Sequence, residues 1–148
     1  MTMGAPDHRD AARAVQSVRY AVLTVSDSRT EATDDSGRLI RTLMSEAGHL
    51  LADAELVRNI PRDIQAAARR FLQGPAQCLV ITGGTGAGRR DLTIETITPL
   101  LDKVLPGFGE LFRWLSYGEI GSAAMMSRAL CGVSRGKILC CLPGSEAA

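Results

Sequence analysis

The sequence is poor in aromatic residues and in net charge. Aromatic residues make up only 4% of its 148 residues, so a core must be built from Leu, Ile, Val, Ala and Met, a composition that suits helices packed on a sheet. The 17 basic and 16 acidic residues leave a formal net charge of +1. This balance gives no electrostatic case for binding nucleic acid or an anionic membrane surface, so any anion-binding site must be local.

The sequence also lacks the patterns of a zinc protein or an exported protein. None of its four cysteines lies in a Cys-x-x-Cys pair, and neither of its two histidines is near one. Three cysteines fall in apolar, strand-like runs, so we expect reduced structural thiols in a reducing compartment. There is no signal peptide and no run of about 20 apolar residues. We therefore expect a soluble, cytoplasmic protein with no membrane partner.

The order of apolar and polar segments predicts one α/β domain. Residues 1–18 are polar and alanine-rich and predict a flexible N-terminal arm that could pack on a neighbouring subunit, whereas residues 19–148 contain no linker or repeat. Strands are expected over residues 20–25, 50–57, 78–82 and 137–142, and helices over 35–47, 63–72, 93–104, 109–116 and 122–130. Pro99 is expected to shorten or bend its helix. The alternation predicts a three-layer α/β/α sandwich with a mostly parallel sheet.

Three of the predicted strands end in turns that suit a phosphorylated ligand. The turns are Ser26-Asp27-Ser28, Gly83-Gly84-Thr85-Gly86 and Pro143-Gly144-Ser145. Ligands of open α/β sheets bind beyond the carboxyl ends of the strands, where glycine allows close backbone approach and free N–H groups can bind phosphate. A tight strand-to-helix connection is the alternative explanation of the glycine turn. Its spacing matches neither a Walker A loop nor the Gly-x-Gly-x-x-Gly dinucleotide fingerprint.

Charged residues downstream of the glycine turn favour the phosphate interpretation. Arg89 and Arg90 could pair with phosphate, and Asp91 is placed to hold Mg²⁺ between phosphates. A solvated surface loop is the alternative. Asp63, two residues after a proline, is first of all an acidic residue at a helix start, with a metal or catalytic role as the second interpretation. Because no Ser-His-Asp or Cys-His arrangement is present, these parts suit phosphoryl or nucleotidyl transfer.

Several separate motifs occur together in a specific order and spacing. They are Thr24-Val25-Ser26-Asp27, Asp35-Ser36-Gly37, Ile81-Thr82-Gly83-Gly84-Thr85-Gly86 with Arg90-Asp91-x-Thr93-x-Glu95, Pro106-Gly107-Phe108-Gly109-Glu110-x-Phe112-Arg113, Ser127-Arg128-Ala129 and Leu142-Pro143-Gly144-Ser145. With them the chain resembles the MoaB/MogA family of molybdenum cofactor biosynthesis proteins from about Tyr20 to its C-terminal end. The stretch from 109 to 121 resembles the MoaB branch more than the MogA branch.

The resemblance implies a molybdopterin-binding fold. In active family members the reaction is Mg²⁺-dependent adenylyl transfer from ATP to the molybdopterin phosphate, with release of pyrophosphate. It further implies homo-oligomers, trimers or hexamers. Carried over to this sequence, Asp91 would bind the metal and serve catalysis together with Asp63. The ligand-binding residues would be Ser26, Asp27, Gly83, Gly84, Thr85, Gly86, Arg90, Ser127, Pro143, Gly144 and Ser145.

The sequence departs from the family pattern in three places. Arg62 stands directly after the proline, where the family usually has its second functional aspartate, so that Asp63 comes one residue later. Ile94 stands where the family often has proline. Only three residues follow Ser145, where the family has a C-terminal helix, so we expect that helix to be absent and apolar surface to be exposed. The alternatives to an adenylyltransferase are a non-catalytic molybdopterin-binding or carrier protein of the same pathway and an oligomeric interaction module.

Overall fold

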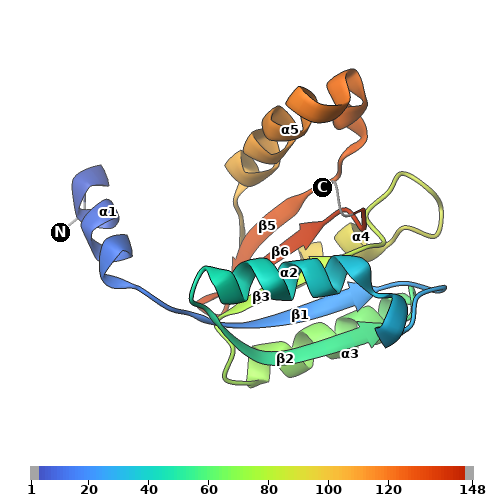
Figure 1. The fold of residues 1–148 in the computed structure, drawn as a ribbon, viewed down its shortest axis with the longest axis horizontal. Helices are drawn as coiled ribbons and strands as arrows, with labels where there is room; N and C mark the ends of the chain where they lie inside the picture. The colour runs from blue at the N-terminus through green and yellow to red at the C-terminus, as the bar shows by residue number, and fades with distance from the viewer. Residues whose placement is uncertain (1–3, 146–148) are drawn as a thin grey trace.

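A six-stranded sheet runs through the computed structural model, which describes residues 4–145 (Figure 1). The strands are β1 (Arg19–Val25), β2 (Leu50–Val57), β3 (Cys78–Thr82), β4 (Lys103–Val104), β5 (Leu130–Ser134) and β6 (Lys137–Leu142). Their order in the sheet is β2-β1-β3-β6-β5-β4. The neighbouring strands β2, β1, β3 and β6 are parallel to one another, whereas β5 is antiparallel to β6 and β4 is antiparallel to β5. The prediction of a mostly parallel sheet is confirmed.

Helices cover both faces of this sheet. They are α1 (Ala5–Ala14), α2 (Asp35–Glu46), α3 (Pro61–Gln73), α4 (Thr93–Ile97) and α5 (Pro106–Ile120), with 3-10 turns η1 (Glu31–Thr33), η2 (Thr98–Leu100) and η3 (Gly121–Met126). The helices α3 and α4 pack on one face and α2 on the other, while α5 contacts β5 and η3. The helix α1 stands apart from the sheet, within the stretch for which the sequence predicts an arm (Figure 1).

The core forms on the face of the sheet that α3 and α4 cover. Leu23, Ile81 and Leu139 come from three adjacent parallel strands and are at most 2% exposed. They pack with Ile64 of α3 and Ile97 of α4, both completely buried. Because these strands are covered on both faces, their sequences read as continuous apolar runs. On the other face, the Tyr20 hydroxyl donates to the Arg41 carbonyl of α2 at 3.2 Å.

Two of the predicted helices are wrong in part, and β4 and β5 were missed. The predicted helix 93–104 ends after the η2 turn that contains Pro99, and β4 follows it. Instead of a helix, residues 122–130 form η3 and the start of β5, while the helix predicted over 109–116 is the longer α5. A two-residue turn joins β5 to β6, with φ of 51° at Arg135 and 74° at Gly136. Positive φ at both positions is the geometry of a type I′ hairpin, which explains the antiparallel edge.

The four cysteines are free thiols on the central strands. Cys131 and Cys140 lie opposite each other on β5 and β6, and their sulfur atoms are 2.9 Å apart. Cys141 is completely buried in the core, and burial, assisted by the charge of Cys131, raises its pKa to about 12. Cys131 and Cys141 are buried, as expected of cysteines that serve as small apolar core residues.

Candidate functional site

A cavity of about 450 Å³ lies at the carboxyl ends of the parallel strands. Its lining residues come from the ends of β1, β3 and β6, the first turn of α2, and the segments before α4 and β5. They are Thr24, Val25, Ser26, Arg29, Ser36, Thr82, Gly83, Gly84, Thr85, Gly86, Asp91, Met126, Ser127, Arg128, Pro143, Gly144 and Ser145. The cavity therefore lies where an open α/β sheet usually binds its ligand.

The first two residues of the glycine turn have to be glycine. Gly83 and Gly84 have φ of 96° and 66°, a backbone conformation that L-residues rarely adopt. A Cβ on Gly83 would lie 2.2 Å from the carbonyl oxygen of Val25, and one on Gly84 would lie 2.3 Å from Thr93 Oγ1. The turn is held in place because that Thr93 hydroxyl donates to the Gly83 carbonyl at 2.8 Å and the Gly83 N–H donates to the Leu142 carbonyl at 3.1 Å.

The segment after the turn folds back and brings Asp91 to the cavity. The Gly88 N–H donates to Asp91 Oδ2 at 3.2 Å, and the Asp91 N–H donates to the Gly88 carbonyl at 3.1 Å. A Cβ on Gly86 or on Gly88 would lie less than 3.0 Å from the same carboxylate, at 2.6 and 2.8 Å. The glycines of this segment therefore leave room for Asp91, a role that the sequence analysis did not assign to Gly88.

An ion pair supports the far side of the glycine turn. Arg128 Nη1 donates to the Gly86 carbonyl at 2.7 Å, and Arg128 Nη2 pairs with the Glu95 carboxylate. Partial burial raises the pKa of Glu95, but the hydrogen bond and the charge of Arg128 outweigh this effect and lower it. Both residues belong to motifs noted in the sequence. Because they are 33 residues apart in the chain, the spacing of the motifs did not predict their contact.

The chain turns sharply after β1 and brings Arg29 to the cavity. Ser26 Oγ accepts hydrogen bonds from the N–H groups of Ser28 and Arg29, at 3.2 and 3.0 Å. Arg29 Nη1 is shielded from solvent and has no hydrogen-bond partner in the structure. Sequence analysis missed Arg29, and its position three residues beyond a ligand-facing serine was the one available signal.

A buried carboxylate holds the start of α2 against β1. Asp34 Oδ2 accepts from the Thr24 hydroxyl at 2.7 Å, and Asp34 Oδ1 accepts from the Gly37 N–H at 3.0 Å, which caps the helix. A Cβ on Gly37 would lie 2.2 Å from this carboxylate. The cap fixes Ser36 at the cavity wall. Asp34 is thus the N-cap of α2.

Three predicted site residues do not line the cavity. Asp27 is exposed, and its Oδ1 accepts from the Asn59 N–H at 2.9 Å. Asp63 lies in the first turn of α3 and pairs with Arg62, with 3.4 Å between Nε and Oδ1. Arg90 is exposed in the loop before α4. The other predicted ligand residues and Asp91 do line it.

A magnesium ion in this cavity would have few protein ligands. Within residues 4–145, no three His, Cys, Asp or Glu side chains gather in a group that could hold a metal ion. Asp91 is the one carboxylate among the lining residues. This set fits Mg²⁺, which is commonly held by one or two carboxylates together with substrate phosphates and water.

No helix in the described part of the chain is long and apolar enough to span a membrane.

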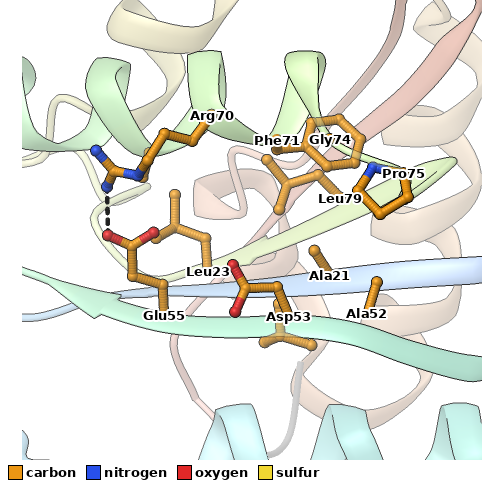
Figure 2. A pocket seen from close by; sticks show the side chains of 13 residues that line it. Ala21, Leu23, Ala52, Asp53, Glu55, Arg70, Phe71, Gly74, Pro75 and Leu79 are labelled. Carbon is orange, nitrogen blue, oxygen red and sulfur yellow. Dashed lines mark hydrogen bonds and ion pairs between the residues drawn. The ribbon is translucent and has the colours of Figure 1, made fainter.

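A second, smaller cavity of about 90 Å³ lies between β2 and α3 (Figure 2). Its walls are apolar side chains such as Leu23, Phe71 and Leu79, and a Glu55–Arg70 ion pair lies at one side. At about 30 Å³ for each water molecule, it would hold roughly three waters. It is too small for a nucleotide or a pterin, so we regard it as a packing gap.

Comparison with known proteins places the chain in one family. Residues 21–148 match the family described as "probable molybdopterin binding domain". The chain is 46% identical to molybdenum cofactor biosynthesis protein B of Bacillus subtilis (strain 168) over 151 residues, which cover 99% of this chain and 86% of that protein.

Solved structures with the same fold carry related names. A crystal structure of molybdenum cofactor biosynthesis protein B is 45% identical, with a TM-score of 0.84, and the match covers 87% of this chain and 81% of that one. The tungsten cofactor synthesizing protein MoaB from Pyrococcus furiosus is 37% identical, with a TM-score of 0.80 and coverage of 88% and 84%. The chain therefore belongs to the molybdopterin-binding domain family of molybdenum cofactor biosynthesis proteins, among the MoaB-like members.

Proposed function

We propose that this protein binds molybdopterin in the cavity at the carboxyl edge of the sheet and catalyses adenylyl transfer from ATP to the molybdopterin phosphate. The observation that carries the proposal is the meeting of the glycine turn, Asp91 and the turns after β1 and β6 around one cavity. A cavity of about 450 Å³ is within the range of small-molecule sites. Family membership supplies the identity of the ligand.

The reaction requires positioning and charge neutralisation rather than a protein nucleophile. An oxygen of the molybdopterin phosphate attacks the α-phosphorus of ATP, the bond from that phosphorus to the bridging oxygen breaks, and pyrophosphate leaves. Mg²⁺ held by Asp91 would neutralise phosphate charge. Because Gly83 and Gly84 have no side chains, the ligand can approach their backbone closely, and Arg128 contacts the same turn through the Gly86 carbonyl.

The test compares Asp91→Asn with wild-type protein. Purified protein is incubated with molybdopterin, ATP and Mg²⁺, and adenylylated product and pyrophosphate are quantified. Because the substitution keeps the shape of the side chain but removes the charge that binds the metal, turnover should fall by about 100-fold or more while molybdopterin affinity changes little. Asp10→Asn is the matched control, since Asp10 is exposed on α1 and lies outside the cavity lining. Equal turnover of Asp91→Asn and wild type would refute the catalytic role.

A non-catalytic molybdopterin carrier is the second candidate function. It is favoured by the single carboxylate in the cavity lining, because Asp63, the other proposed catalytic acid, pairs with Arg62 on α3 instead. Molybdopterin binding by the wild-type protein without any adenylylated product in the same assay would establish this alternative.

We also propose that the protein forms homo-oligomers, trimers or hexamers, through α5 and η3. This surface carries a concentration of exposed apolar side chains, which are Leu111, Trp114, Leu115, Tyr117, Ile120, Met125 and Met126. Trp114 is 71% exposed and Met125 is 77% exposed. Contiguous apolar surface of this kind on a small domain commonly marks a protein–protein interface, where aromatic residues and methionine are enriched.

A further inference from the structure

Arg29 carries a charge that no described residue balances. Its side chain lines the cavity, and its Nη1 atom is shielded from solvent without a hydrogen-bond partner. Among residues 4–145, no carboxylate lies within 4.0 Å of its guanidinium group. A buried donor without an acceptor costs free energy, and the cost is larger when the group is charged. An anionic ligand beside the guanidinium group would balance this charge.

The loop after β1 holds Arg29 in this position before any ligand binds. Two N–H groups of the loop donate to Ser26 Oγ, and one of them is the N–H of Arg29 itself. The backbone at Arg29 is therefore fixed beside the cavity that this residue and the glycine turn both line. Such pre-organisation lowers the entropic cost of binding a ligand.

The other arginines near the cavity do not provide a free charge there. Arg128 lines the cavity, but it pairs with Glu95 and donates to the Gly86 carbonyl. Arg89 and Arg90, which the sequence favours as phosphate partners, are exposed and absent from the lining. Arg29 is thus the lining residue with an unbalanced positive charge in the described structure.

We propose that Arg29 binds an oxyanion of the ligand, a phosphate group, through its guanidinium group and selects phosphorylated over unphosphorylated ligands. This assignment rests on the proposed function, because it gives a protein partner to the phosphate that molybdopterin carries. Arginine forms short, charge-assisted hydrogen bonds to phosphate and stays protonated at all working pH values.

The test uses inorganic phosphate as the probe, titrated against the protein and followed by ³¹P NMR. The variants are Arg29→Met, which keeps an apolar stem without charge, Arg29→Lys, which keeps the charge, and Arg69→Gln as the matched control, an exposed arginine of α3 outside the cavity lining. Phosphate affinity should fall by about tenfold or more in Arg29→Met and by less in Arg29→Lys, and should stay within about twofold of wild type in Arg69→Gln. The urea midpoint of ligand-free Arg29→Met should be equal to or above that of wild type, since the substitution removes an unpaired donor.

A lower urea midpoint in Arg29→Met would identify Arg29 as a structural residue and overturn the proposal. Equal phosphate affinity of Arg29→Met and wild type would overturn it too, as would an equal loss in Arg69→Gln or no phosphate binding by the wild type. Molybdopterin affinity of the same variants separates this inference from the proposed function. If wild type and Arg29→Met bind molybdopterin equally, only the role of Arg29 fails. If wild type binds phosphate through Arg29 but does not bind molybdopterin, the proposed function fails and the role of Arg29 stands.

Discussion

Replacing Gly83 by alanine tests whether the glycine turn is set by its backbone conformation or by the close approach of β1. Gly83 and Gly48 have similar φ values of 96° and 85°. A Cβ on Gly83 would lie 2.2 Å from the carbonyl oxygen of Val25, whereas a Cβ on Gly48 would meet no atom within 4 Å. Gly48→Ala therefore measures the conformational cost alone, and Gly83→Ala measures that cost together with the steric one.

The two costs can be estimated separately. A left-handed backbone conformation costs an L-residue about 1–2 kcal/mol, which is the whole effect expected for Gly48→Ala. At Gly83 the Val25 carbonyl would have to move by about 1 Å, but Val25 is held between its β1 neighbours and its partner Val57 in β2. Overpacking of this kind adds about 1–3 kcal/mol, so Gly83→Ala should lose about 2–5 kcal/mol.

Thermal unfolding provides the assay. For a chain of this length about 1 kcal/mol corresponds to roughly 3 °C, so the melting temperature should fall by about 3–6 °C in Gly48→Ala and by about 6–15 °C in Gly83→Ala. Molybdopterin affinity should decrease in Gly83→Ala only, because the displaced turn lines the cavity. Equal losses of stability in the two variants would show that the contact with β1 does not constrain the turn, and the structural reasoning would be wrong.

Three further substitutions test the packing of the site, the core and the exposed helix. Thr93→Val should lower the free energy of unfolding in urea by about 1–3 kcal/mol, since its buried hydroxyl donates to a carbonyl of the glycine turn; Thr98→Val, at an exposed hydroxyl, should change it by less than about 0.5 kcal/mol. Cys141 has its pKa raised to about 12 by burial, against 9.0 as the ordinary value, so the unfolded chain loses this proton first and stability falls as the pH rises from 9 to 12. The free energy of unfolding should therefore be lower at pH 10 than at pH 8, by on the order of 1 kcal/mol, and urea titrations of Cys141→Ala should lack this part of the pH dependence. Trp114→Glu should reduce the mass of the oligomer measured by light scattering. Gln73→Glu adds the same charge at an exposed position of α3 and should leave the mass unchanged. An unchanged mass in Trp114→Glu would exclude α5 as the interface.

The parallel half of the fold could be predicted from the sequence because its signals are local. A strand covered on both faces reads as an unbroken apolar run, as in β1, β3 and β6, and α2 begins with a capping aspartate and ends before a glycine. The antiparallel edge gave weaker signals. The strand β4 has two residues, and β5 contains Gly132, where a Cβ would lie 2.6 Å from the Lys103 carbonyl of the neighbouring strand. A glycine that permits close backbone approach reads in sequence as a break in a strand.

The residues of the site differ in the same way. Those that are contiguous in the chain could be predicted from the sequence, whereas the contacts that the fold brings together could not. The glycine turn and Asp91 could be predicted because they follow one strand directly, and their neighbours in sequence are also their neighbours in space. The contact between Arg128 and Glu95, and the unpaired position of Arg29, depend on tertiary structure, so charge and spacing led to Arg90 instead. An arginine next to a glycine turn in sequence is free to point into solvent, whereas Arg29 follows a hydrogen-bonded turn and has a guanidinium nitrogen shielded from solvent, which costs desolvation free energy. That cost would give Arg29 a measurable effect on stability in the absence of ligand, with the sign opposite to that of its effect on binding, and a residue that merely supports the fold would change both in the same direction.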